Sequence, residues 1–366
     1  MISYKGKNKK AVNYLKTTYF DHPEWVECDI SIMTATWIKY RDEVEDIVLA
    51  HPRIFPTFKK GQYDFDFPTL PPLYELGDHR DAWGTLWRNI ERGMDSIPIE
   101  CPLEDWDAFD TWTPPEPLTQ SDWGPQPNWD DVRKSLDVNR AAGELATGGG
   151  LPHGHFFMRL YYVRGFDNLM IDMATDDPRL QKLITVVTDY NVAVVQKYVE
   201  LGADHVVFGE DLGMQNALPI SPEMWRKYVK PSYEATVGPC RDLGLPVYMH
   251  SDGHILEIIP DLKDVGVTMI NPQIRANGID GIRDVIKGNL AMNLDLDRQL
   301  FPFASKQEIV DHVHEAYDKL YMPEGGLSFT AECEPDVPLE NIETICAALE
   351  EVCDPPEPEY RKQIED

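Results

Sequence analysis

The sequence contains few basic residues for its length. Its 366 residues include 34 lysines and arginines but 63 aspartates and glutamates, which gives a formal net charge of −29. Such an excess of negative charge repels nucleic-acid phosphates and anionic lipid headgroups, so we exclude nucleic-acid binding and binding to a membrane surface. No apolar run approaches the roughly 20 residues of a transmembrane helix, and residues 1–10 lack the apolar core of a signal peptide. We therefore expect a cytoplasmic protein.

Cysteines are also scarce, and they are not arranged in pairs. The six cysteines have no short paired spacings, which argues against a zinc finger and against a disulfide framework, so we expect reduced thiols. They are Cys28, Cys101, Cys240, Cys333, Cys346 and Cys353.

Two common nucleotide-binding motifs are missing as well. No GxGxxG sequence opens a predicted helix, and the glycine run 148–150 lacks the lysine and the following serine or threonine of a P-loop. We interpret this glycine run as a flexible hinge. Residues 105–129 contain five prolines among four tryptophans, a combination that excludes regular helix yet argues against disorder. We predict an ordered surface loop there, with the wall of an aromatic substrate pocket as the alternative.

Strands and helices alternate regularly in the second half of the chain. Asp177 and Pro178 have the residue types that begin a helix, and Ser305 with Glu308 forms a capping box for a later one. Five successive strand–helix units, each near the roughly 30 residues of a βαβ step, predict a parallel sheet. Residues 155–163 form a plausible further core strand, and residues 9–19 an outer helix.

These elements favour a closed barrel over an open, doubly wound sheet. We predict an α/β fold, a (β/α)8 TIM barrel with an N-terminal helical extension and a Pro/Trp-rich insertion. It would be a single domain over residues 1–366. Residues 1–150 would hold the extension, the first strands and the Pro/Trp-rich loop, residues 151–355 the regular strand–helix units, and residues 356–366 an acidic tail.

Residues able to bind a metal ion follow three of the predicted strands. Residues 247–254, VYMHSDGH, begin as an apolar strand and continue as a loop in which His250 and Asp252 point the same way. A catalytic zinc ion takes three protein ligands and keeps one position open, so a third ligand is needed. Cys333 is the candidate and Glu210 the reserve, since both also follow short apolar runs. The alternative is a turn in which these residues cap the next helix.

Several longer stretches carry a resemblance to a known family. They are DAWGTLW with PLEDWDAFDTW, then RGFDNLMIDMATDDP, LGADHVVFGEDLGMQNALPISPEMWRKYVKP, the HSDG loop and ECEPDVPLENI. Together, in this order, they resemble the uroporphyrinogen decarboxylase superfamily, and specifically its corrinoid-dependent methyltransferase branch, over nearly the whole chain.

The resemblance implies a zinc site. In the zinc methyltransferases of this family the corresponding loop reads His-x-Cys-Gly, and a second cysteine lies near the C-terminal end. By position, His250 matches the histidine, Asp252 replaces the first cysteine and Cys333 matches the second. Aspartate in place of thiolate makes the zinc ion a better acceptor for oxygen donors. Glu210 or Asp211 would orient the ion or carry a proton. The alternative for each is a carboxylate that only supports the ligands or caps a helix, and for Asp211 we favour this alternative.

The resemblance also implies a reaction. We expect a methyltransferase that moves a methyl group from a methoxylated, methoxy-aromatic small molecule to the Co(I) of a corrinoid, in the manner of an O-demethylase component. No corrinoid-binding domain is visible, so the corrinoid must be carried by a partner protein. The alternatives are a methylcorrinoid:thiol methyltransferase, a tetrapyrrole decarboxylase, for which clustered N-terminal arginines are missing, and a family member without activity. The oligomeric state stays open, a homodimer included.

Overall fold

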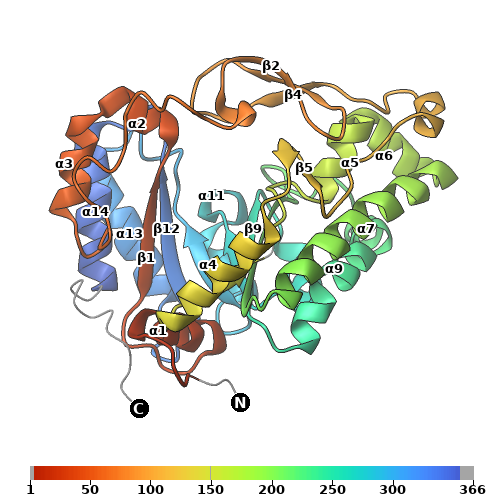
Figure 1. Ribbon diagram of the computed structural model, residues 1–366. Coiled ribbons are helices and arrows are strands. Elements are labelled where there is room, and N and C mark those ends of the chain that lie inside the picture. Colours follow the sequence, from red (N-terminus) through yellow and green to blue (C-terminus); the bar gives the residue numbers. More distant parts are fainter. Residues whose placement is uncertain (1–3, 149, 355–366) are drawn as a thin grey trace. The chain divides into compact units, whose positions relative to one another are not determined.

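The computed structural model describes residues 4–148 and 150–354, and its contacts divide the chain into two compact units. The first unit comprises Met1–Leu70, Ala142–Glu144 and Met269–Asp366, and the second Pro71–Ala141 and Leu145–Thr268. Figure 1 labels the elements of both. The predicted acidic tail, residues 356–366, lies outside the described residues.

The first unit contains four parallel strands with helices between them. The strand order is β1-β12-β11-β10. The strands are β1 (Glu27–Ile32), β10 (Met269–Pro272), β11 (Ala291–Asp295) and β12 (Leu327–Cys333). The helices are α1 (Lys9–Tyr19), α2 (Thr34–Tyr40), α3 (Asp42–Ala50), α11 (Ile274–Asn277), α12 (Ile279–Val285), α13 (Lys306–Leu320) and α14 (Leu339–Cys353), of which α13 and α14 pack side by side (Figure 1).

The second unit contains three parallel strands, two small antiparallel sheets and the long helices of the middle of the chain. Its parallel strands are β7 (Thr147–Gly148), β8 (His205–Asp211) and β9 (Val247–Asp252), with β8 between the other two. The antiparallel strands are β2 (Gly77–Arg80), β3 (Leu86–Asn89) and β4 (Ile97–Glu100), and β5 (Gln120–Ser121) with β6 (Gly124–Pro125). The helices are η1 (Pro72–Tyr74), η2 (Trp106–Asp110), α4 (Trp129–Ala141), α5 (Phe157–Arg164), α6 (Phe166–Thr175), α7 (Pro178–Glu200), α8 (Pro222–Tyr228), α9 (Lys230–Asp242), η3 (Leu256–Ile258) and α10 (Ile259–Val265).

The predicted fold class is confirmed. Parallel strands that alternate with helices along the chain make an α/β fold of the TIM-barrel type. The described residues form seven parallel strands, one fewer than the eight of a complete barrel. Among residues 4–148 and 150–354, no helix combines the length and the apolar character that crossing a bilayer requires.

Local sequence signals explain where the principal helices begin. The Asp177 side chain accepts a hydrogen bond from the backbone N–H of Arg179 and Pro178 is the first residue of α7, as predicted. The predicted capping box of α13 is also present, because the Ser305 and Glu308 side chains each accept a hydrogen bond from the other's backbone N–H. Both helices then bury a stripe of apolar residues at helical spacing.

Two local predictions were wrong. Residues 155–163 were expected to form a strand, but most of them belong to helix α5, because an apolar run this continuous is also compatible with a buried helix. His250 and Asp252 are not loop residues but end strand β9. The interpretation of the glycine run as a hinge stays a prediction; Gly148 belongs to β7, and a Cβ on Gly150 would overlap the Tyr198 ring.

The Pro/Trp-rich segment is ordered, as predicted, and helps to enclose a buried ion-pair network. Trp112 Nε1 donates to the carbonyl of Trp83 over 2.7 Å, and Trp83 Nε1 donates to Asp122 over 2.9 Å. The guanidinium of Arg159, whose side chain is only 3% exposed, pairs with both Asp81 and Asp122. These contacts anchor helix α5 to the loops that precede it.

Candidate metal centre

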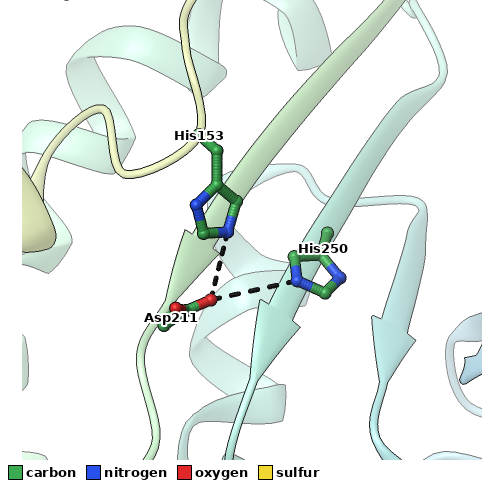
Figure 2. A group of neighbouring side chains, drawn as sticks. All are labelled: His153, Asp211 and His250. Atoms are coloured by element: carbon green, nitrogen blue, oxygen red, sulfur yellow. Dashed lines mark ion pairs between the residues drawn. The ribbon is translucent and has the colours of Figure 1, made fainter. Parts of the chain in front are cut away.

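Three metal-binding side chains of the second unit converge at the carboxyl ends of β8 and β9 (Figure 2). Asp211 is the last residue of β8, and His250 lies on β9, paired in register with Gly209. The third is His153, from the segment that precedes α5. Ligands in α/β folds bind at this end of the strands, so the position suits a functional site.

The nitrogen and oxygen atoms of these side chains face one another. Nε2 of His153 lies 3.1 Å from Oδ1 of Asp211, and Nε2 of His250 lies 3.9 Å from the same oxygen. One ligand atom from each of the three residues lies within 4.8 Å of the other two. Asp252, next but one to His250 on β9, places its Oδ1 3.2 Å from the same Nε2 of His250.

The Asp211 carboxylate provides a test of whether these residues fit a metal ion. Its Oδ1 is buried, yet among the described residues it has no hydrogen-bond partner. The ring nitrogen of His153 is close enough to donate, but it does not point at the oxygen. A close but misaligned nitrogen and oxygen are the arrangement that two ligands of a shared ion adopt, so the residues fit a cation such as Zn²⁺.

The site is open to solvent on one side. The side chains of His153, Asp211 and His250 are 49%, 30% and 24% exposed. Desolvation is the largest single influence on the pKa of His153 and lowers it. The interactions of the imidazole with Asp211 raise the pKa, and together with Glu210 they outweigh desolvation, so the pKa lies above its usual value. Because all three side chains are partly exposed, a small molecule could reach an ion held between them.

Contacts with β8 hold the segment that carries His153. The backbone N–H of Gly154 donates to the carbonyl of Gly209 over 2.9 Å, and Nδ1 of His155 lies 3.2 Å from the same carbonyl oxygen. Gly209 itself makes room for His153, since a Cβ at this position would come within 2.9 Å of Cδ2 of the imidazole ring. The position of His153 therefore depends on a missing side chain in β8.

Glu210, the predicted reserve ligand and proton carrier, is fully buried beneath the site. Its carboxylate accepts hydrogen bonds from the backbone N–H groups of Phe156 and Met158 and lies 3.3 Å from Nδ1 of His155. Burial raises the pKa of Glu210 to about 7, and burial lowers the pKa of His155 to about 4. Glu210 thus fastens the start of α5 to β8.

An aromatic cluster adjoins the site. Trp87, Met158 and Tyr162 form its buried part, and Trp123 and Tyr161 are partly exposed. Trp87 and Tyr162 meet edge to face with ring centroids 4.6 Å apart. The cluster is continuous with the metal-binding group, because the backbone N–H of Asp211 donates to Sδ of Met158 over 3.1 Å.

Cys333 lies in the first unit. It is the last residue of β12, and its backbone carbonyl accepts hydrogen bonds from the Thr36 hydroxyl and the Met33 N–H. Burial raises the pKa of its thiol to about 12. The assignment of His250, Asp252 and Cys333 as one ligand set stays a prediction.

Sequence reasoning missed His153. It lies in the sequence PHGHFF, outside every predicted strand end, and residues from 155 onward looked like a core strand. The only signal was the pair of histidines around Gly154, which indicates metal-binding capacity without indicating a partner. The contact with Gly209 that positions the ring spans more than 50 residues, and no local pattern contains it.

The comparisons with known proteins agree with this fold. The profile of the family described as Uroporphyrinogen decarboxylase (URO-D) matches residues 140–352. A solved structure of a methyltransferase from Methanosarcina mazei has a TM-score of 0.58 and 15% identity, and the match covers 94% of this chain and 99% of the other. A dihydropteroate synthase from Xanthomonas albilineans is similar over 46% of this chain and 61% of its own, with 18% identity and a TM-score of 0.30. No curated protein sequence matches. Because the family profile covers more than half of its length, the chain belongs to the uroporphyrinogen decarboxylase family.

Proposed function

We propose that this protein is a methyltransferase of the uroporphyrinogen decarboxylase family. It takes the methyl group of a methoxylated, methoxy-aromatic donor and passes it to the Co(I) of a corrinoid held by a separate protein. The observation that carries the proposal is the convergence of two imidazoles and a carboxylate at the ends of β8 and β9, beside an aromatic cluster.

The donor atoms of this group suit an oxygen-containing substrate. Imidazole nitrogen and carboxylate oxygen are the ligands typical of catalytic zinc, which keeps a position open for substrate. Zinc bound there would supply a Lewis acid that takes up the charge developing on the ether oxygen as the methyl group leaves. His250 belongs both to this group and to the ligand set predicted from sequence, and so is the residue on which the two agree.

The aromatic cluster supports the choice of a methoxy-aromatic donor. Tyr161 and Trp123 are the partly exposed members, and Met158 connects the cluster to Asp211. An aromatic ring stacked against these side chains would exclude water from the neighbouring methoxyl group. In our proposal these residues bind and orient the donor.

The family and the similar fold support the acceptor. A solved structure that matches this chain over 94% of its length is named a methyltransferase. In our proposal the corrinoid arrives on a partner protein, as the family resemblance implies.

One feature argues against tetrapyrrole decarboxylation, the reaction that gives the family its name. A tetrapyrrole substrate presents several carboxylates, which free arginines would bind. The two buried arginines of α5 are already engaged, Arg159 with Asp81 over 3.0 Å and Arg164 with Asp172 over 2.7 Å. A thiol is also a less suitable methyl acceptor, because the metal-binding group His153, Asp211 and His250 contains no thiolate ligand.

A methylation assay tests the proposal directly. The zinc-loaded protein would be mixed with chemically reduced free corrinoid and, separately, with methoxybenzoates, methanol or a methyl thioether. We expect loss of the Co(I) absorption and growth of methyl-Co(III) with methoxybenzoates. Methylation from the thioether alone, or methyl transfer from methylcorrinoid to a thiol without any reaction of the methoxy compounds, would overturn the donor class.

A further inference from the structure

We propose that His153, Asp211 and His250 form a complete three-ligand site for one divalent cation, built from nitrogen and oxygen donors alone. His153 is then the ligand that sequence comparison did not indicate, and no cysteine takes part. The inference goes beyond the proposed function, because it concerns which atoms hold the ion and would stand even if the methyl donor belonged to another class.

The spacing of the three atoms fits a single ion. Two ligands at the usual zinc–nitrogen and zinc–oxygen distances, in tetrahedral geometry, lie about 3.3 Å apart. Oδ1 of Asp211 is 3.1 Å from Nε2 of His153 and 3.9 Å from Nε2 of His250. The second distance exceeds the tetrahedral value by about 0.6 Å. The ligand atoms of all three residues lie within 4.8 Å of one another, so modest side-chain movements would bring them to one ion. Figure 2 shows the two rings and the carboxylate directed toward the same region.

The hydrogen bonding of Asp211 supports the same assignment. A buried carboxylate oxygen without a hydrogen bond is costly, on the order of 1–3 kcal/mol. Within the described part of the chain Oδ1 of Asp211 is such an atom, although an imidazole nitrogen lies 3.1 Å away. A cation between the two would satisfy the oxygen, and it would also explain why the nitrogen is close without being aligned.

The surrounding backbone is built to hold His153 at this place. Gly209 lacks the side chain that would displace the ring, and the carbonyl of Gly209 accepts the N–H of Gly154. Glu210 then fixes the next turn through the N–H groups of Phe156 and Met158. Three consecutive residues of β8 therefore shape the site. Gly209 leaves room for His153, Glu210 holds the segment that follows it, and Asp211 supplies the carboxylate.

The donor set has a chemical consequence. Three protein ligands leave one position of a tetrahedral ion open, and without thiolate donation the ion prefers oxygen ligands there, such as water, an ether or a phenolate. Asp252, with its Oδ1 3.2 Å from the same Nε2 of His250, lies on the ion's side of that imidazole, so it is a neighbour of the ion and not a partner of the other ring nitrogen. In this site a thiol would be a poor substrate ligand.

Metal content tests the ligand set without any activity measurement. The full-length protein would be stripped with a chelator, reloaded with Zn²⁺ or Co²⁺, and analysed by mass spectrometry of the metal and by absorption spectroscopy. We expect one zinc ion per chain in the wild type and in Cys333→Ser. His153→Gln, Asp211→Asn and His250→Gln should each bind zinc more weakly by roughly 100-fold or more, since a direct ligand costs at least as much as its outer partners.

The Co²⁺ spectrum separates the two ligand sets. A sulfur ligand gives an intense near-ultraviolet charge-transfer band, whereas nitrogen and oxygen ligands give only weak visible bands, and we expect the latter. Loss of zinc in Cys333→Ser together with a sulfur charge-transfer band in the wild type would overturn the proposal, as would full zinc binding by His153→Gln. His79→Gln, on β2 of the same unit, is the matched control and should bind zinc normally.

The test distinguishes the loss of zinc binding from misfolding of a variant and from the absence of methyl transfer. Circular dichroism would verify that each variant is folded, and Asp211→Asn keeps the size of the side chain in case another substitution at this position disturbs β8. A protein that binds zinc through these three residues yet methylates no corrinoid would contradict the proposed function and leave the metal site intact.

Discussion

The backbone of Gly213 lies so close to that of Gly253 that a Cβ atom on Gly253 would come within 2.6 Å of the Cα of Gly213. This contact joins the loops that leave β8 and β9. Two hydrogen bonds accompany it, from the N–H of Gly213 to the carbonyl of Asp252 and from the N–H of His254 to the carbonyl of Met214. Backbone contacts therefore join the strand ends that carry Asp211 and Asp252, together with the hydrogen bond from the N–H of Leu212 to the Ser251 hydroxyl.

We expect Gly253→Ala to destabilise the protein by about 2–5 kcal/mol, because the added methyl group overlaps backbone and cannot be accommodated by a side-chain rotation. Gly253 also has a φ of +80°, which a residue with a Cβ rarely adopts. Urea denaturation followed by circular dichroism would measure the loss. Gly244→Ala is the matched control, since Gly244 has a φ of +72° but no atom within 4 Å of the added Cβ. It should cost only about 1 kcal/mol, and equal losses in the two variants would refute the steric explanation.

Gly209→Ala should weaken metal binding with little effect on stability. The new Cβ would meet Cδ2 of His153 at 2.9 Å, and the imidazole, which is 49% exposed, can swing away into solvent. We expect zinc affinity to fall by on the order of 10–100-fold, as for the loss of a residue that orients a ligand. Titration of the stripped protein with zinc would measure it.

Gly238→Ala provides the control for Gly209→Ala. Gly238 lies in helix α9, and a Cβ there would meet only the end of the Arg241 side chain at an ordinary 3.7 Å. This variant should bind zinc like the wild type. Unchanged zinc affinity in Gly209→Ala would mean that His153 is not a ligand or that its ring does not depend on the space above β8.

Stability should fall as the pH rises from about 4.5 to about 7, because of Glu210. Burial raises the pKa of Glu210 from 4.5 to about 7, so the folded protein favours the protonated carboxyl. The resulting stabilisation, roughly 3 kcal/mol at most, is complete below about pH 4.5 and is lost by about pH 7. In Glu210→Gln this part of the pH dependence should be absent. The neighbouring His155, with a pKa lowered to about 4, acts in the opposite sense by favouring its neutral form, but it is common to both proteins.

Denaturation by urea across this pH range, with a chelator present, would measure the effect. The wild type should lose stability relative to Glu210→Gln between about pH 4.5 and about pH 7. Parallel pH profiles for the two proteins would show that the Glu210 carboxyl titrates at its ordinary pKa.

Arg159→Leu should destabilise the protein by roughly 3–5 kcal/mol, because it leaves the carboxylates of Asp81 and Asp122 buried without their shared cation. The guanidinium also lies 5.2 Å from the centroid of the Trp83 ring, so the near-ultraviolet circular dichroism of the tryptophans should change. Denaturation by urea would measure the free energy. Arg88→Ala, which removes an exposed pair with Asp78, is the control and should change stability little. A small effect at Arg159 would mean that water compensates the two carboxylates.

The fold was predictable where short-range patterns govern it. The caps at Asp177 and Ser305 and the apolar periodicity of α7 and α13 are properties of neighbouring residues, and they gave the helices and the α/β class correctly. Helix α5 was not predictable in this way, because its sequence FMRLYYVR is apolar on most sides and therefore has no clear period. Its helical state follows from its contacts with β8 and with the Arg159 network.

The candidate site was predictable in part for the same reason. His250, Asp211 and Glu210 follow apolar runs, and the rule that functional residues gather at strand ends was sufficient to select them. It could not rank them: Glu210 points into the protein and binds backbone, whereas Asp211 faces the two histidines. Successive side chains along β8 alternate between its two faces. The last residue of β8 could not be predicted from sequence, so the face on which each side chain lies could not be predicted either. His153 depends on the absence of a side chain at Gly209, which no pattern around His153 reveals.

At Gly209, in the middle of β8, the stability of the strand and the space for the His153 imidazole require different residues. Glycine weakens a strand, so a small side chain at position 209 would slightly stabilise β8. The same replacement would occupy the space in which the imidazole rests. Selection of random variants for heat resistance alone should therefore accumulate side chains at this position, and subsequent selection for zinc retention should return it to glycine.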